Sequence, residues 1–154
     1  MKISIITITY NAGRFISSCL DSLSSQTYKN IEHIIIDGKS SDNTLEIINK
    51  HHWTPTKFIS EPDNGIYDAL NKGIDLASGD IIGFLHSDDF FSEKDILERI
   101  INAFYTKDAN VVYGDLEYVT VENPEKTIRF WKSCNFKYSL IEKGWMPPHP
   151  TLFV

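Results

Sequence analysis

The sequence predicts an α/β fold in which helices flank a mostly parallel sheet. The first observation behind this prediction is that β-branched apolar runs alternate with amphipathic helical patterns along the chain. The second is that these runs are apolar throughout, which is typical of strands buried on both faces. The third is that polar residues stop three of the runs, at residues 9–11, at Asp37 and at Asp88–Asp89. In such sheets ligands bind beyond the carboxyl ends of the strands, so these polar residues are candidate site residues.

The expected strands are short apolar runs that end at turn-forming or acidic residues. In chain order, they cover residues 3–9, 31–36, 58–59, 79–85 and 111–119. The loop 10–13 halts the first run, Asp37 and Gly38 close the second, and two adjacent carboxylates follow the fourth. The sequence stops at Val154 inside what resembles the start of another apolar strand. We therefore expect it to be a piece of a longer protein.

The expected helices are segments in which apolar residues recur at a spacing of three or four. In chain order, these patterns cover residues 15–23, 45–48, 66–77 and 96–104. Ser40 to Asp42 are expected to cap the second helix, Gly79 to end the third as a C-terminal cap, and Ser92 to cap the fourth. No linker, repeat or low-complexity segment interrupts this order, so the whole chain, residues 1–154, is expected to form one domain.

Composition limits the classes of partner and compartment. A chain of 154 residues with 42% hydrophobic content can enclose one full core. A net charge of −6 without any cluster of Lys and Arg argues against a nucleic-acid partner. No apolar stretch approaches the ~20 residues of a membrane span, and the N-terminus lacks signal-peptide features. Cys19 and Cys134 make neither a CxxC pair nor a disulfide framework, so both are expected to be small core residues of a soluble, cytoplasmic protein.

Asp88 and Asp89 form the most informative motif, because adjacent acids at a strand end repel each other and gain nothing from packing. A cation or a hydrogen-bonded ligand is therefore expected at this strand end. A hard divalent ion such as Mg²⁺ is held by one or two carboxylates together with substrate phosphates, which suits a metal–phosphate site. The alternative is that both acids only cap the next helix, where they favour its N-terminal dipole.

The ends of the first two strands offer further candidates. Asp37 can accept a hydrogen bond from the N–H of a base, and the following helix start offers free backbone donors. The alternative is an ordinary loop and helix cap. Thr9, Tyr10 and Asn11 offer an aromatic ring for stacking and two hydrogen-bonding side chains. The alternative there is that Asn11 caps the first helix.

Two more pairs of residues have roles that the sequence leaves open. Asn71 and Lys72 lie on the expected third helix, where Lys72 could reach a diphosphate or simply be solvated. His86 lies two residues before Asp88, and could be a core histidine, a substrate contact or a poor metal ligand. His149 stands between two prolines in a stiff turn, and its role is equally open.

Several signatures of other nucleotide-binding proteins are missing. No GxGxxG follows the first strand, no GxxxxGK(S/T) occurs, and no acid pair lies at the end of the first strand. These absences disfavour dinucleotide oxidoreductases, P-loop NTPases and receiver domains. A nucleotidyltransferase is also disfavoured, because the loop after the first strand contains only one glycine, Gly13.

Four segments in this order resemble the family 2 glycosyltransferases. They are residues 5–11, 34–44, 63–74 and 77–89. The resemblance implies the GT-A fold, a nucleotide-diphospho-sugar donor, a divalent cation, Mn²⁺ or Mg²⁺, and inversion at the anomeric carbon. Carried over by position, it places Thr9, Tyr10 and Asn11 beside the base and ribose of the donor, and Asp37 in a hydrogen bond to the base.

The same resemblance places Asn71 and Lys72 on the helix that flanks the nucleotide. Asp88 and Asp89 match the acidic DXD-type motif, with Asp88 nearer the ribose and Asp89 the better metal ligand, although both are candidates for the metal. Two departures stand out. Gly38 stands where many members carry a second acid, and His86 where many carry the first acid of the triplet, which predicts weaker metal affinity.

The interpretation that follows is the donor-binding part of an inverting glycosyltransferase that builds a polysaccharide or cell-surface glycan. The resemblance implies that a downstream Asp takes the proton of the acceptor hydroxyl, so the catalytic base is expected beyond Val154. The acceptor is expected to be a glycan or a lipid-linked molecule, and peripheral membrane association is compatible with this. The alternative is a nucleotide-sugar-binding module without turnover.

Overall fold

The computed structural model describes residues 1–154 and confirms the α/β fold class. Its central sheet has four parallel strands in the order β3-β2-β1-β4. In chain order, the strands are β1 Ile3–Thr9, β2 Ile31–Asp37, β3 Lys57–Ser60 and β4 Ile81–Phe84. The strand order reverses between β1 and β4, so the carboxyl ends of these two strands flank the position where α/β sheets bind ligands.

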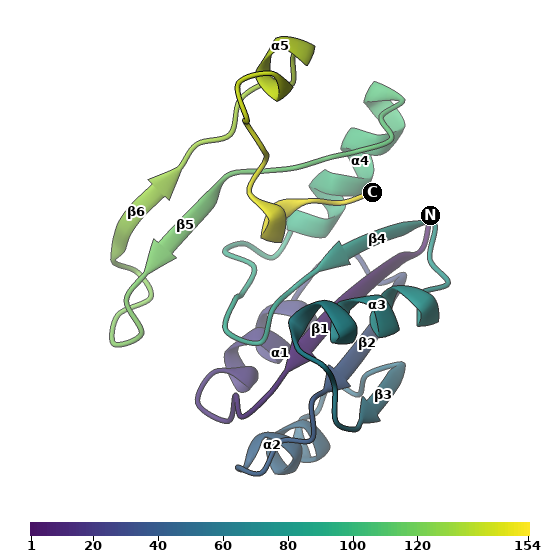
Figure 1. Ribbon diagram of the computed structural model, residues 1–154, viewed down its shortest axis with the longest axis vertical. Helices are drawn as coiled ribbons and strands as arrows, with labels where there is room; N and C mark the ends of the chain where they lie inside the picture. The colour runs from purple at the N-terminus through teal and green to yellow at the C-terminus, as the bar shows by residue number, and fades with distance from the viewer.

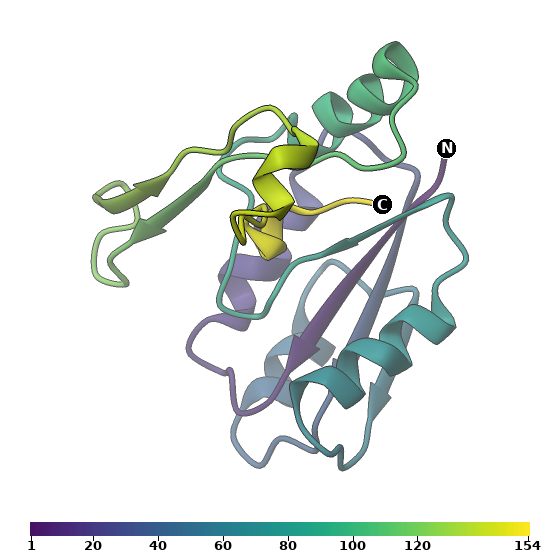
Figure 2. The same ribbon diagram turned by 45° about the horizontal axis from the view of Figure 1, so that its top comes forward.

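Helices cover both faces of this sheet (Figures 1 and 2). They are α1 Ile16–Ser24, α2 Thr44–Lys50, α3 Ile66–Leu76 and α4 Ile96–Lys107. The larger core joins Ile3 and Ile5 of β1 to α1, α2 and α4, and the smaller joins Ile6 to Ala69 of α3. Successive strand residues point to opposite faces, so a sheet covered on both sides requires the continuous apolar runs seen in the sequence.

The second half of the chain adds a hairpin and a returning edge segment. The hairpin pairs β5 Leu116–Val119 with β6 Thr127–Trp131 and projects away from the central sheet (Figures 1 and 2). A short helix, α5 Tyr138–Ile141, and a 3₁₀ turn, η1 His149–Thr151, follow. Phe153 then forms antiparallel bridges to Gly83 of β4 and to Val112.

The pairing of Phe153 with Val112 explains one difference between the expected and the observed strands. The pattern predicted one strand over residues 111–119, but only Leu116–Val119 belong to the hairpin. Val112 exchanges backbone hydrogen bonds of 2.9 and 2.8 Å with Phe153 instead. Residues 111–119 therefore pair with two different partners, Phe153 and β6. The pattern of apolar residues along the chain does not show where one pairing ends and the other begins.

Two expected helix boundaries are also wrong. Helix α4 begins at Ile96 after Asp95, and Ser92 lies outside it. Helix α3 ends at Leu76 with Ala77 in extended conformation, so Gly79 is not its C-terminal cap. Gly79 instead lies against β1, where an added Cβ would lie 2.7 Å from the backbone nitrogen of Ser4. Glycine is needed there for close backbone approach.

The two cysteines have different environments. Cys19 lies in the larger core, as expected, and burial raises its pKa to about 12. Cys134 is exposed, because it follows the projecting hairpin and has no core to enter. The expectation that both are core residues is therefore wrong for Cys134. None of the helices combines the length and apolar character that crossing a bilayer requires.

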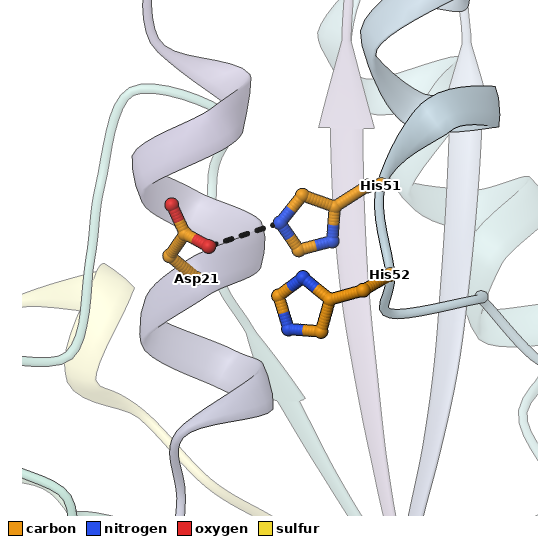
Figure 3. A group of neighbouring side chains, drawn as sticks. All are labelled: Asp21, His51 and His52. Atoms are coloured by element: carbon orange, nitrogen blue, oxygen red, sulfur yellow. Dashed lines mark hydrogen bonds and ion pairs between the residues drawn. The ribbon is translucent and has the colours of Figure 1, made fainter.

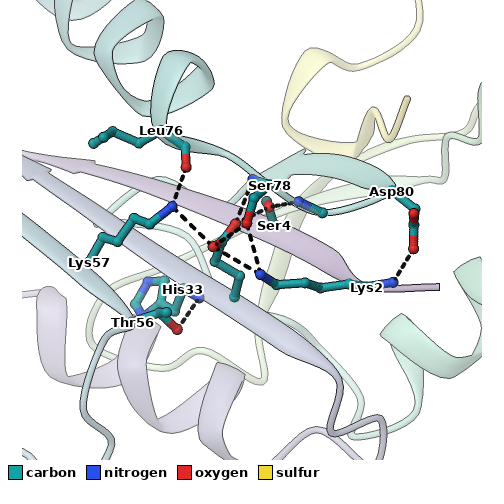
Figure 4. Close-up of polar contacts among 10 residues, drawn as sticks. Lys2, Ser4, His33, Thr56, Lys57, Leu76, Ser78 and Asp80 are labelled. Carbon is teal, nitrogen blue, oxygen red and sulfur yellow. Dashed lines mark hydrogen bonds and ion pairs between the residues drawn. The ribbon is translucent and has the colours of Figure 1, made fainter.

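A buried carboxylate joins the strands at the amino-terminal end of the sheet, and Figure 4 labels its partners Lys2, Ser4, Lys57 and Ser78. Glu32 of β2 is 2% exposed and accepts hydrogen bonds from the Ser4 hydroxyl and from the backbone and hydroxyl of Ser78. It also pairs with Lys2 at 3.0 Å and Lys57 at 3.2 Å. Burial alone would raise the pKa of Glu32, but the hydrogen bonds outweigh it and hold the pKa well below the usual range.

Candidate functional site

The carboxyl ends of three neighbouring strands meet at one edge of the sheet. The register places Thr9 of β1 opposite Asp37 of β2, and Asp37 opposite Ser60 of β3. Strand β4 lies on the other side of β1 and continues through Leu85 into the loop that carries the two adjacent acids. The candidates that follow strands therefore lie at one edge, around the position where the strand order reverses.

Asp37 holds the loop that follows its own strand. It is fully buried, and its Oδ2 accepts hydrogen bonds from the backbone of Ser40 at 2.9 Å and the hydroxyl of Ser60 at 2.6 Å. Its Oδ1 accepts a third bond from the Ser40 hydroxyl. Sequence reasoning missed this internal role, since Ser60 comes from another strand. The expected bond from Asp37 to a nucleotide base stays a prediction.

The loops after β1 and β2 are joined by Asn11. Its backbone nitrogen donates to the Ser40 hydroxyl at 2.8 Å, and its side-chain oxygen accepts from the backbone of Ser41 at 2.8 Å. Asn11 and Lys39 both adopt left-handed backbone conformations, with φ of 49° and 63°. Such strained residues persist where the surrounding structure fixes them, and they concentrate at functional sites. Asn11 does not cap α1, which begins at Ile16.

Thr9 and Tyr10 present different surfaces at the same edge. The Thr9 hydroxyl is buried without any hydrogen-bond partner, an arrangement that calls for an explanation because an unpaired buried polar group costs free energy. The Tyr10 side chain is 66% exposed and borders the loop after β2, because a Cβ at Gly38 would lie 3.4 Å from its ring. An exposed ring beside an unpaired hydroxyl can stack on a planar ligand and bond to it.

Asn71 and Lys72 lie on α3, and only Lys72 has strong contacts. Its ammonium pairs with Glu61 at 2.8 Å and with Asp68 at 3.4 Å, and Glu61 raises the pKa of the lysine. Asn71 is exposed. To bind a diphosphate, Lys72 would have to break its ion pairs with Glu61 and Asp68. The geometry therefore does not favour diphosphate binding by Lys72, which stays a prediction.

The two adjacent acids lie beyond the end of β4, next to the site edge. Asp88 is exposed and Asp89 is half-buried. Burial raises the pKa of Asp89 to about 6, the charge of Asp88 acts in the same direction, and no hydrogen bond stabilises the Asp89 carboxylate. They do not cap α4, which begins at Ile96. A carboxylate destabilised in this way favours a positively charged ligand.

The acids have the donor chemistry of a divalent cation site. Oxygen ligands suit Mg²⁺ and Mn²⁺, and two carboxylates without internal partners leave the remaining coordination positions to a bound substrate. The chemistry of the residues at this edge therefore fits a divalent cation, and the assignment of Asp88 and Asp89 as its ligands stays a prediction.

His86 and His149 complete this end of the sheet, and sequence reasoning left their roles open. Their ring centroids lie 5.7 Å apart at an interplanar angle of 60°. His149 reaches this position because Phe153, four residues later, pairs with β4. Burial lowers the pKa of His86, and His149 adds to this effect. No local sequence signal would have predicted the contact.

Comparison with known proteins agrees with the motifs. The sequence model described as Glycosyl transferase family 2 matches residues 4–151. The chain belongs to this family. An uncharacterized glycosyltransferase of Mycobacterium tuberculosis (strain H37Rv) is 40% identical over 106 residues, covering 68% of this chain and 40% of the relative. A PGL/p-HBAD biosynthesis glycosyltransferase of Mycobacterium bovis (strain BCG) is 39% identical over 120 residues, covering 73% and 46% respectively. The family 2 chain thus spans less than half the length of these relatives.

Solved structures confirm the GT-A fold of this family 2 chain. S. aureus TarS 1-349 in complex with UDP-GlcNAc matches with a TM-score of 0.65 and 27% identity, covering 72% of this chain and 33% of that one. The mannosyltransferase PcManGT from Pyrobaculum calidifontis, in complex with GDP-Man and Mn2+, matches with a TM-score of 0.68 and 22% identity, covering 76% and 36%.

A group of three potential metal ligands comes from other elements, α1 and the residues after α2 (Figure 3). Asp21 of α1 and His51 and His52 after α2 place one ligand atom each within 4.8 Å of one another. His51 already uses both ring nitrogens, since Nε2 lies 3.0 Å from Asp21 and Nδ1 accepts from the Trp53 backbone at 3.0 Å. These bonds join α1 to the end of α2. The acids expected to bind metal, Asp88 and Asp89, do not belong to this group.

Proposed function

We propose that this family 2 chain binds a nucleotide-diphospho-sugar and belongs to an enzyme that transfers the sugar, with inversion, to an acceptor hydroxyl. The observation that carries the proposal is the pair of acids beyond β4, at the reversal of strand order, without an internal partner for Asp89. Supporting it, TarS, which is 27–28% identical, has been crystallised with UDP-GlcNAc and with UDP.

The residues at this edge would have different roles in binding the donor. Tyr10 would stack on the base, and the Thr9 hydroxyl would gain the hydrogen bond it lacks. Asn11 and Asp37 would act mainly by fixing the two loops that frame the nucleotide. Asp89, with Asp88 beside it, would hold the divalent cation. When bound, that cation neutralises negative charge on the leaving nucleoside diphosphate.

The acceptor side of the reaction lies mostly outside the residues described. We propose that the base that takes the acceptor proton lies beyond Val154, so the chain by itself would bind donor better than it transfers sugar. The acceptor would be a glycan or lipid-linked molecule in polysaccharide synthesis, with cytoplasmic location as part of the same proposal. A binding module without turnover is the second candidate, and a longer version of the chain that is equally unable to transfer sugar would favour it.

Calorimetric titration tests the donor site. UDP, GDP and dTDP are each titrated with and without Mn²⁺, and we expect Mn²⁺ to tighten binding of at least one of them by about tenfold or more, which is about 1.4 kcal/mol. Asp89→Asn should abolish this gain, whereas Asp21→Asn, in the group of Asp21, His51 and His52, should keep it. If Asp89→Asn binds as tightly as the parent in Mn²⁺, or if Asp21→Asn alone loses the gain, the assignment of the site is wrong.

A further inference from the structure

Two histidines from distant parts of the chain meet beyond the end of β4. His86 directly follows Leu85 there, and His149 comes from the first residue of η1, more than sixty residues later in the sequence. Their rings approach edge to face, with centroids 5.7 Å apart. The two imidazoles therefore share one local surface with Asp88 and Asp89.

The position of His149 is fixed by buried backbone pairing. Phe153 is 2% exposed and bridges both Gly83 and Val112, and Val154 exchanges hydrogen bonds of 2.8 and 3.0 Å with Ile82. The Phe153 ring occupies the space above Gly83, where an added Cβ would lie 2.2 Å from a ring carbon. Only a few residues separate these bonds from His149, so the imidazole is held close to the acids.

Both imidazoles lack the internal hydrogen bonds that a structural histidine makes. His33, the buried histidine of β2, lies 3.0 Å from the Thr7 hydroxyl through Nε2 and accepts from Trp53 through Nδ1 at 3.1 Å. No hydrogen bond joins the side chains of His86 and His149 to the rest of the chain, and their rings meet each other edge to face. Each therefore retains ring nitrogens that can bind a ligand.

Charge indicates which kind of ligand these nitrogens would bind. His149 lies near enough to Asp89 to oppose the rise in the pKa of that acid. Asp89 and His86 both lie near enough to His149 for its charge to act on them, and the charge of Asp88 acts on the same two groups. A diphosphate that binds a cation held by Asp88 and Asp89 has further anionic oxygens that do not contact the cation. These oxygens can accept hydrogen bonds from the N–H groups of the imidazoles.

The imidazoles suit this role better than that of additional metal ligands. No set of three ligand atoms at this edge lies within 4.8 Å, and the one set that does is formed by Asp21, His51 and His52. The imidazoles are therefore not close enough to both acids to complete a three-ligand metal group with them.

We propose that His86 and His149 form a diphosphate-binding pair that donates N–H hydrogen bonds to phosphate oxygens of the donor. This inference rests on the proposed function and adds two substrate-contacting residues to the site. It also gives the segment after Pro148 a role, because that segment brings one half of the pair to β4. Donors aimed at a leaving diphosphate stabilise the charge that it gains as the glycosidic bond breaks.

The experiment compares a nucleoside diphosphate with its monophosphate. The diphosphate that the parent binds most tightly in Mn²⁺ is titrated, followed by the matching monophosphate. We expect His149→Ala and His86→Ala each to weaken diphosphate binding by about tenfold, with a much smaller loss for the monophosphate, which lacks the second phosphate. His52→Ala is the matched control and should bind both as the parent does, since His52 is an exposed histidine outside the edge.

The outcomes separate this inference from the proposed function. If the parent binds a diphosphate in an Asp89-dependent manner while both histidine variants bind it unchanged, only the histidine inference fails. Equal losses for the diphosphate and the monophosphate also overturn it, because they show a role other than phosphate binding. If the parent binds none of the nucleotides, both fail. Urea unfolding of each variant shows whether a loss reflects the site, and because His149 is exposed we expect His149→Ala to unfold at the parent's midpoint.

Discussion

Glu32→Ala is expected to be strongly destabilising. Glu32 is 2% exposed and accepts from Ser4 and Ser78, so its removal takes an acceptor from these groups and the ion-pair partner from two lysines. Removing one partner of a buried ion pair costs roughly 3–5 kcal/mol. Lys2 and Lys57 are 35% and 36% exposed and can regain water, which places the expected loss at the lower end, about 3 kcal/mol.

Urea unfolding followed by circular dichroism measures this loss. For an m-value of about 2 kcal/mol/M, a loss of about 3 kcal/mol lowers the midpoint by about 1.5 M. Glu46→Ala is the control, because its 2.6 Å pair with Lys50 is exposed and should contribute no more than about 0.5 kcal/mol. A loss below about 1 kcal/mol in Glu32→Ala, similar to that of the control, would refute the reasoning.

The same carboxylate predicts the sign of a pH effect. Its pKa is lower in the folded chain than the ordinary value of 4.5, so the folded state binds fewer protons than the unfolded state. The stabilisation is therefore present above pH 4.5 and is lost as pH falls below it. Glu32→Gln, which cannot ionise, should lose this component of acid sensitivity, and identical pH profiles of the two proteins would contradict the assignment.

Three further predictions concern the site edge and its supports. Gly83→Ala should cost about 1–3 kcal/mol in urea unfolding, because the new methyl would lie 2.2 Å from the Phe153 ring. Lys39→Gly should raise stability by about 1 kcal/mol, measured as a higher midpoint of thermal unfolding, since Lys39 has φ of 63°. Asp37→Ala should cost about 2–3 kcal/mol and weaken nucleotide binding, because Ser60 and the loop after β2 lose their acceptor; unchanged calorimetric affinity would argue against a loop-holding role at the site.

The layered sheet and its edge could be predicted because local rules determine them. A run such as residues 3–9 can be buried on both faces only in a covered sheet, and its polar end must then lie at the carboxyl edge. Two adjacent acids after a strand also predict a ligand site at Asp88 and Asp89; the structure provides no hydrogen bond to Asp89, and the ligand itself stays a prediction.

The remaining features depend on contacts that local patterns do not contain. The approach of His149 to His86 requires the pairing of Phe153 with β4, which joins residues about seventy positions apart. The enclosure of Asp37 requires a hydroxyl from the next strand. Helix α4 begins after Asp95 instead of Ser92 without a side-chain hydrogen bond at its cap, so the usual capping preference gave the wrong start.

The pairing of Phe153 with β4 also has a consequence for self-association. Unpaired strand edges invite another chain to add to a sheet, and proteins defend against this by covering the edge or by keeping it short and charged. In this sheet, Phe153 and Val154 occupy the free side of β4, and the opposite border, β3, has only four residues and begins with Lys57. The segment that carries His149 therefore also protects the sheet from edge-to-edge aggregation.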